Sequence, residues 1–165
     1  MCYRKTFRAF NRTDCHKGFY NDDNPTKSLS KIDYTDFQTL PDDDEFPYIS
    51  AHDLLCGSCE CFALALKAMF DYNVYIIEEK GGQGFHVFCQ IYKKRNWYYV
   101  DARGITTSFS EFMDIAKIFL HDEYIIRPVD ANDIDEWESD SNYNEEGYAF
   151  AEAVITKYKE CYTLE

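Results

Sequence analysis

The hydrophobic positions of this chain follow the period of a helix in two stretches. In residues 58–71 large apolar side chains recur every three or four positions, which predicts a helix with one buried face. These side chains are Phe62, Leu66, Met69 and Phe70. Ser58 stands where an N-cap is expected. The same period predicts a second helix from Ser110, as its N-cap, to about Leu120.

Short runs rich in β-branched and aromatic residues predict strands. They are Val74–Glu79, Phe85–Tyr92, Trp97–Asp101 and Tyr124–Val129. Residues 81–84 and 93–96 predict turns. A turn centred between residues 94 and 95 pairs positions near 88 and 101, so Asp101 is expected across or diagonally from His86. Pro128 predicts that the last strand lies at an edge of the sheet.

The flanking regions predict less regular structure. Residues 1–50 are expected to form a loop-rich N-terminal extension, and residues 130–147 an acidic loop with a helical turn near residues 134–137. Residues 148–162 predict a final amphipathic helix. Helices combined with three or four antiparallel strands predict an α+β fold. We expect one domain over residues 1–165, with its core at residues 54–129.

The composition excludes several classes of protein. Among 165 residues, 45% are hydrophobic and 18% aromatic, which is enough for a real core. The net charge of −13 argues against non-specific nucleic-acid binding and fits solubility or a basic protein partner. No apolar run reaches the roughly 20 residues of a membrane span, and no signal peptide is recognisable. With seven cysteines, an odd number, reduced thiols in a cytoplasm are the simplest interpretation; the sequence does not address delivery into a host cell.

Three residues suited to thiol chemistry fall at the ends of the predicted elements. Cys59 follows the small residues Gly57-Ser58 at the start of a helix, His86 opens a strand, and Asp101 closes the next one. A helix N-terminus favours a thiolate. An imidazole can pair with that thiolate, and a carboxylate can orient the imidazole. This series predicts a cysteine hydrolase or an acyl-transfer enzyme.

Cys59 is a better candidate nucleophile than the two cysteines beside it. Cys56 precedes the turn, and Cys61 lies further inside the helix. The backbone amide of Cys59 or Glu60 is expected to supply one oxyanion donor. The second donor stays open between His52, Asp53 and another backbone amide. Taken singly, the three candidate residues also fit a buried thiol, a strand histidine and a turn carboxylate.

The motifs around these residues resemble the papain-like, transglutaminase-like superfamily, most of all its small bacterial and phage members. The resemblance rests on Cys59-x-x-Phe-Ala-x-Ala-Leu, on Phe-His86-Val and on Tyr-Tyr-Val-Asp101-Ala-Arg-Gly-Ile, and it covers roughly residues 54–110. It implies a helix that carries the nucleophile and packs on an antiparallel sheet. It also implies Cys59 as nucleophile, His86 as general base and Asp101 as orienting carboxylate. The superfamily includes peptidases, deamidases, transglutaminases and acyltransferases, so it does not select one activity.

The expected enzyme needs neither a cofactor nor a metal, and its substrate is expected to be a protein or peptide rather than a small molecule. Three alternatives stay open. The first is a non-enzymatic acidic inhibitor or binding protein, such as a phage or bacterial anti-host factor with a papain-like fold. The second is a thioredoxin-like dithiol made by Cys56 and Cys59. The third is a structural zinc site made by His52, Cys56, Cys59 and Cys61.

Overall fold

The computed structural model describes residues 54–55, 57–80, 85–113, 120, 123–139 and 145–164. Its elements, in chain order, are α2 (Cys59–Phe70), β1 (Asn73–Glu79), β2 (Phe85–Lys93), β3 (Asn96–Asp101), β4 (Gly104–Thr106), β5 (Tyr124–Pro128), α4 (Ala131–Ser139), α5 (Glu145–Lys157) and α6 (Lys159–Tyr162). Residues 109–113 are also helical. Helices combined with one antiparallel sheet confirm the predicted α+β class. The expectations for residues 1–50 and 81–84 lie outside the described residues.

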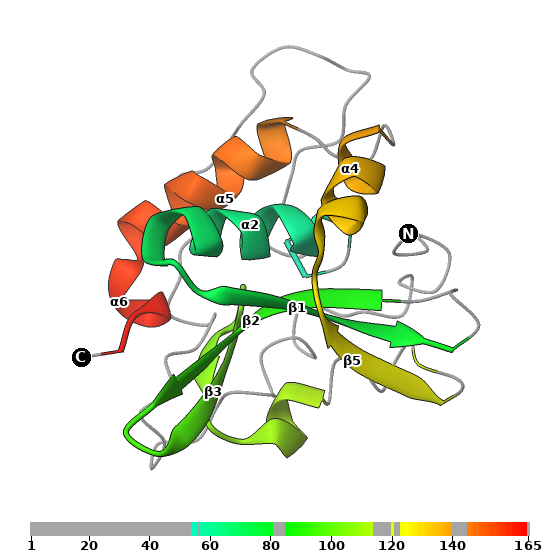
Figure 1. The fold of residues 1–165 in the computed structure, drawn as a ribbon. Coiled ribbons are helices and arrows are strands. Elements are labelled where there is room, and N and C mark those ends of the chain that lie inside the picture. The colour runs from blue at the N-terminus through cyan, green and yellow to red at the C-terminus, as the bar shows by residue number, and fades with distance from the viewer. Residues whose placement is uncertain are drawn as a thin grey trace.

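The sheet has five strands in the order β4-β3-β2-β1-β5 (Figure 1). Every neighbouring pair is antiparallel. Strand β5 lies at one edge, as Pro128 predicts. Strand β4 forms the other edge and was not predicted, because three residues are too few to show a hydrophobic period. The chain enters β4 through Ala102 and Arg103, and Asp101 pairs with Gly104.

The hairpin of β2 and β3 has the predicted register. Its turn is shorter than the expected four residues: Lys93 pairs with Asn96, and only Lys94 and Arg95 lie between them. Both turn residues have positive φ, 52° and 64°, as in the two-residue turns that match the twist of a hairpin. The last pair of the two strands is Cys89 with Val100, so position 88 comes opposite position 101. His86 and Asp101 therefore lie diagonally on one face of the hairpin.

Helix α2 is packed between the sheet and α5 (Figure 1). The ring of Phe62 meets that of Tyr162 edge to face, with centroids 5.2 Å apart. Gly147 lies close against the start of α2, since a Cβ there would be 3.4 Å from Ser58 Oγ. On the opposite face of the sheet, Phe112 packs on Phe88 with centroids 4.5 Å apart. These contacts fix the first turn of α2 above the start of β2.

The two predicted N-caps have different outcomes. Ser58 is the N-cap residue of α2, although its side chain forms no capping hydrogen bond. The expectation that Ser110 caps the next helix is wrong, because Ser108 does so. Ser108 Oγ accepts the amide of Glu111 at 3.2 Å, and the Glu111 carboxylate accepts the Thr106 hydroxyl at 3.1 Å. The spacing Ser-x-x-Glu at 108–111 is the local signal for this cap.

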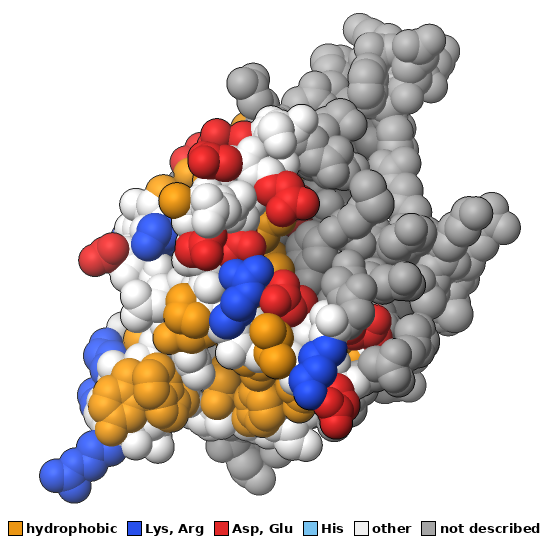
Figure 2. All heavy atoms as spheres, turned by 45° about the vertical axis from the view of Figure 1, so that its right-hand side comes forward, with side chains coloured by type: hydrophobic (Ala, Val, Ile, Leu, Met, Phe, Trp, Pro, Cys, Tyr) orange, Lys and Arg blue, Asp and Glu red, His pale blue; other side chains and the backbone are white. Residues whose placement is uncertain are grey.

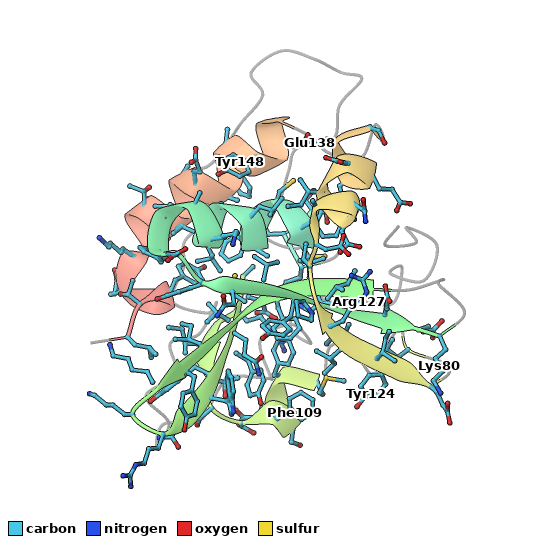
Figure 3. The ribbon with its side chains drawn as sticks, in the orientation of Figure 1. Lys80, Phe109, Tyr124, Arg127, Glu138 and Tyr148 are labelled. Carbon is cyan, nitrogen blue, oxygen red and sulfur yellow. The ribbon has the colours of Figure 1, made fainter. Side chains whose placement is uncertain are left out.

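The acidic segment after β5 is helical over residues 131–139, so the prediction of a loop is wrong there. Asp130 Oδ1 accepts the amides of Asn132 at 2.8 Å and Asp133 at 3.2 Å, which satisfies the start of α4. Arg127 on β5 ties α4 to the sheet by binding both Asp133 and Glu78 (Figure 3).

The C-terminal helix also differs from its prediction. Helix α5 begins at Glu145 rather than at residue 148, and it ends at Lys157. A separate turn of helix, α6, follows from Lys159 to Tyr162. Among the described residues, no helix has the length and apolar character needed to cross a membrane.

Candidate active site

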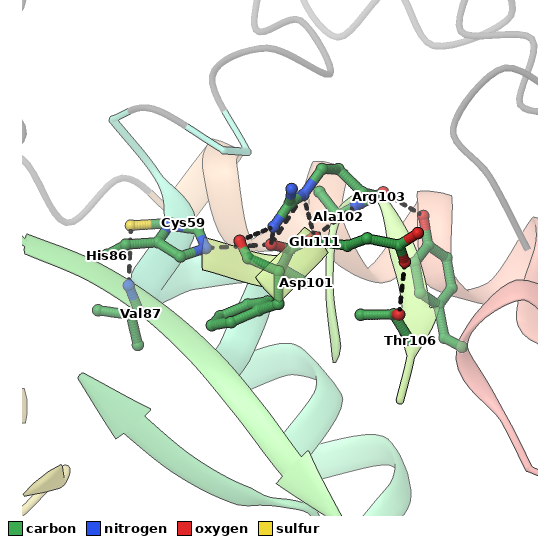
Figure 4. A network of polar contacts seen from close by, with 10 residues as sticks. Cys59, His86, Val87, Asp101, Ala102, Arg103, Thr106 and Glu111 are labelled. Carbon is green, nitrogen blue, oxygen red and sulfur yellow. Dashed lines mark hydrogen bonds and ion pairs between the residues drawn. The ribbon is translucent and has the colours of Figure 1, made fainter. Parts of the chain in front are cut away.

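The structure brings the three sequence-predicted residues into one buried cluster (Figure 4). Cys59 is the first residue of α2, His86 is the second of β2, and Asp101 is the last of β3. Their exposed fractions are 1%, 1% and 2%. A cysteine is often buried, but an aspartate is almost never fully buried unless it is paired, so the contacts of Asp101 and of its partner His86 decide what the cluster can do.

The imidazole of His86 is held by Asp101. His86 Nε2 lies 3.1 Å from Asp101 Oδ2. An ionised carboxylate only accepts hydrogen bonds, so Nε2 is the protonated nitrogen of the neutral ring. Burial lowers the pKa of His86, but hydrogen bonds and charge from Asp101 and Cys59 outweigh burial and raise that pKa to about 9. The site therefore favours an imidazolium at neutral pH.

The sulfur of Cys59 lies where β3 no longer pairs with β2. The last pair of these strands is Cys89 with Val100, and the amide of Val87, just beyond it, donates to Cys59 Sγ at 3.4 Å. The sulfur also belongs to the first turn of α2. A backbone N–H donor, the positive end of a helix and a neighbouring imidazolium all favour a thiolate over a thiol.

Arg103 is a further member of this cluster, which the sequence patterns did not indicate. Its backbone amide and Nε donate to Asp101 Oδ1 at 2.8 and 3.1 Å, and its Nη2 donates to Asp101 Oδ2 at 2.7 Å. Burial would raise the pKa of Asp101, but Arg103 and His86 hold it well below its usual range. Asp101 is therefore ionised and can accept the hydrogen bond from His86 Nε2. The chain turns between β3 and β4, and this turn brings the side chain of Arg103 back to Asp101, which lies two residues before it. The turn was not predicted.

Distant elements lock Arg103 and its turn. Arg103 Nη2 also donates to the carbonyl of Phe112 at 2.9 Å, and the guanidinium lies 5.6 Å from the centroid of the Phe112 ring. The hydroxyl of Tyr162, on α6, donates to the carbonyl of Ala102 at 3.1 Å. The same Phe112 ring lies 6.0 Å from the ring of His86. The orientation of Asp101 is thus fixed by residues from three parts of the chain.

The side chain of Glu60 is a second member of the site that the sequence patterns did not indicate; they indicated only its backbone amide. Its side chain is 4% exposed, and its Oε2 lies 3.6 Å from Cys59 Sγ. Burial raises the pKa of Glu60 to about 7. A glutamate beside a candidate nucleophile was visible in the sequence, but its burial was not, because the first turn of a helix is more often exposed.

The remaining candidates are either elsewhere or outside the described residues. His52, Asp53 and Cys56 are outside them, so the zinc and dithiol alternatives stay predictions. Cys61 and Cys89 are buried thiols. Cys89 donates to the carbonyl of Ala63 at 3.3 Å, and burial raises its pKa above the usual range. Within the described ranges, no group of three or more His, Cys, Asp or Glu side chains could hold a metal ion.

Comparisons with known proteins add nothing to this geometry. No family model, no curated protein and no solved structure matches the chain. The contacts among Cys59, Glu60, His86, Asp101 and Arg103 are therefore the basis for assigning a function.

Proposed function

We propose that this chain is a cysteine-dependent hydrolase or acyl-transfer enzyme that acts on an amide, with a papain-like, transglutaminase-like core. The observation that carries the proposal is the position of His86. Its Nε2 contacts Asp101, while its pKa is raised by the sulfur of Cys59 as well as by that carboxylate. A histidine between a thiol and a carboxylate is the arrangement that activates cysteine nucleophiles.

In the proposed reaction, the Cys59 thiolate attacks the carbonyl carbon of the amide and forms a carbon–sulfur bond. Amides at the start of α2 stabilise the oxyanion. His86 donates its proton to the leaving amine as the carbon–nitrogen bond breaks, which leaves a thioester on Cys59. Water or an amine then attacks the thioester, gives a proton to His86 and releases the thiolate. Asp101 keeps the imidazole in the orientation that both steps require.

A protein or peptide carboxamide is the substrate that we propose. The alternative of an acidic binding protein would require a continuous acidic face. On the face in Figure 2, the acidic side chains of the described residues are interrupted by lysine, arginine and hydrophobic side chains. Among the described residues, Tyr124, Ile125 and Ile126 of β5 are each more than a third exposed. The described part of this face is therefore mixed and not continuously acidic.

The test is the rate of alkylation of each cysteine by iodoacetamide as a function of pH, mapped by mass spectrometry. We expect Cys59 to react about tenfold or more faster than Cys61 near pH 6, because only the thiolate reacts and His86 stabilises it. His86→Ala should remove this advantage. Cys61→Ala is the matched control, since it removes a buried thiol from the same turn of α2 and should leave Cys59 fast.

Two results would overturn the proposal. Cys59 could react no faster than Cys61 and Cys89 at every pH, or it could stay fast in His86→Ala. In the first case, capture of a partner by the intact chain becomes the next experiment. In the second case, the sulfur is activated without the imidazole, and the assigned triad is wrong.

A further inference from the structure

Glu60 is placed to exchange a proton with the candidate nucleophile. Its Oε2 lies 3.6 Å from Cys59 Sγ, within hydrogen-bonding distance for sulfur, and the Glu60 side chain is 4% exposed. A carboxylate buried without a cation is costly, and its protonation relieves that cost. Among the described residues, no lysine or arginine forms an ion pair with Glu60.

Other ionisable groups near the start of α2 do not replace Cys59 as the partner of Glu60. The buried ones on the elements that pack against α2 are Glu79 on β1, His86 and Cys89 on β2, and Asp101 on β3, and α5 carries the half-buried Tyr148. Asp101 is already neutralised by Arg103. In the described part of the chain, the Cys59 sulfur is the one ionisable side-chain group in contact with the Glu60 carboxyl.

We propose that Glu60 is a second proton-carrying group of the site and that its carboxyl shares one proton with the thiol of Cys59. This inference rests on the proposed function, because it assigns a role beside the same nucleophile. In the exchange, the Sγ–H bond breaks, its electron pair stays on sulfur, and the proton forms an O–H bond with Oε2. A thiol beside a carboxylate becomes a thiolate beside a neutral carboxylic acid, and the charge of the pair does not change.

The exchange moves negative charge to the better site. On Glu60 the charge has no ion-pair partner among the described residues, whereas on Cys59 it meets the Val87 amide and His86. The neutral Glu60 carboxyl can then donate a hydrogen bond to the sulfur. When the pair loses its last proton, a second negative charge appears beside the sulfur. Since burial raises the pKa of Glu60 to about 7, this loss falls in the neutral range. The site should therefore work best on the acid side of neutrality.

The first test compares two alkylating reagents at Cys59. Iodoacetamide is neutral and iodoacetate is an anion, and the same thiolate attacks both reagents, so the ratio of their rates cancels the fraction of thiolate. As Glu60 ionises between pH 5.5 and 8, the ratio of the iodoacetamide rate to the iodoacetate rate should rise about threefold to tenfold, because a nearby negative charge repels the anion. Glu60→Gln should remove this rise. Glu152→Gln, at an exposed glutamate of α5, is the matched control and should keep it.

The second test is the titration of the Glu60 carboxyl carbon by NMR in the ¹³C-labelled full chain, which needs no reaction at Cys59. A shared proton couples the two groups, so Glu60 should titrate in two steps in the wild type and in one step in Cys59→Ala. Identical titrations in the two proteins, or an equal rise of the reagent ratio in Glu60→Gln, would overturn the proposal. If neither reagent modifies Cys59, the proposed function loses its support while the NMR titration still decides the role of Glu60.

Discussion

Two arginine–carboxylate clusters in this molecule use similar contacts in different surroundings. At the candidate site, Arg103 binds Asp101, and their side chains are 1% and 2% exposed. At the β5 edge of the sheet, Arg127 binds Glu78 and Asp133. These three side chains are 32%, 26% and 13% exposed. The first cluster also holds a histidine, whereas the second joins an edge strand to α4.

The difference shows how burial changes the dependence of an arginine–carboxylate pair on its partner. Water partly screens the Arg127 cluster, so its ion pairs contribute less to the stability of the fold than a buried pair does. The Arg103 cluster is shielded from water, so each charge depends on its partner, and the orientation of Asp101 toward His86 is fixed. The Arg127 cluster therefore links β1, β5 and α4. The buried cluster is suited to positioning a reacting group.

The largest expected effect comes from Arg103→Met. This change removes the guanidinium from the buried Asp101 carboxylate and leaves only His86 beside it, and it should lower the free energy of unfolding by about 3–5 kcal/mol. Urea denaturation followed by circular dichroism measures the change. Arg127→Met is the matched control, because it removes the same side chain from the exposed cluster.

A double variant separates the charge from the packing. Asp101→Leu combined with Arg103→Met removes both charges, so it should be more stable than Arg103→Met alone. If the double variant were as unstable as the single one, lost packing of Arg103 against Phe112 would account for the effect, and the contrast with Arg127 would no longer concern charge.

A smaller effect is expected in the pH dependence of stability. The folded state lowers the pKa of Asp101 through Arg103 and His86, against burial, and lowers that of Asp133 mainly through Arg127. A carboxyl with a lowered pKa stabilises the fold above its unfolded pKa, and that contribution is lost as the pH falls. The free energy of unfolding should therefore decrease from pH 5 to pH 3, by at most about 1.4 kcal/mol per pH unit for each such group.

The two carboxyls should contribute unequally to that slope. Asp101→Asn should flatten the slope more than Asp133→Asn, as measured by urea denaturation at half-unit steps of pH. Equal slopes in the two variants would mean that burial does not distinguish the clusters in the acid range.

The smallest effect is expected for Arg127→Met. The loss of Arg127 from its partly exposed partners should cost about 0.2–1 kcal/mol at low salt, and less in 1 M NaCl, where exposed charges are screened. The cost of Arg103→Met should not change with salt. Thermal unfolding at two salt concentrations tests both statements, and a salt-dependent cost for Arg103→Met would show that water reaches the buried cluster.

Local patterns of the sequence determined the elements nearest to the site. The helix after Ser58, the hairpin of β2 and β3, and the diagonal placement of His86 and Asp101 all follow from periods and turns within a few residues. Pro128 likewise indicated the edge strand, because proline removes a donor from the sheet. The α+β class and the grouping of the three site residues were therefore within reach of the sequence.

Other features depend on partners far along the chain, and the sequence did not reveal them. Strand β4 is too short to show a period, and the acidic α4 is held by its cap at Asp130, by Arg127 and by Trp137, which packs against the core. Missing β4 also meant missing the turn that returns Arg103 onto Asp101.

The sequence by itself determined which residue types stand at the ends of α2, β2 and β3, because helix starts and hairpin registers are local. Only the tertiary structure decided that Glu60 is buried beside Cys59 and that Tyr162, sixty residues from Ala102, holds the turn behind Asp101. Burial is the sum of contacts from distant segments, and it sets the pKa values of the site. The identities of the reacting groups are thus encoded locally, while their protonation states depend on the whole fold.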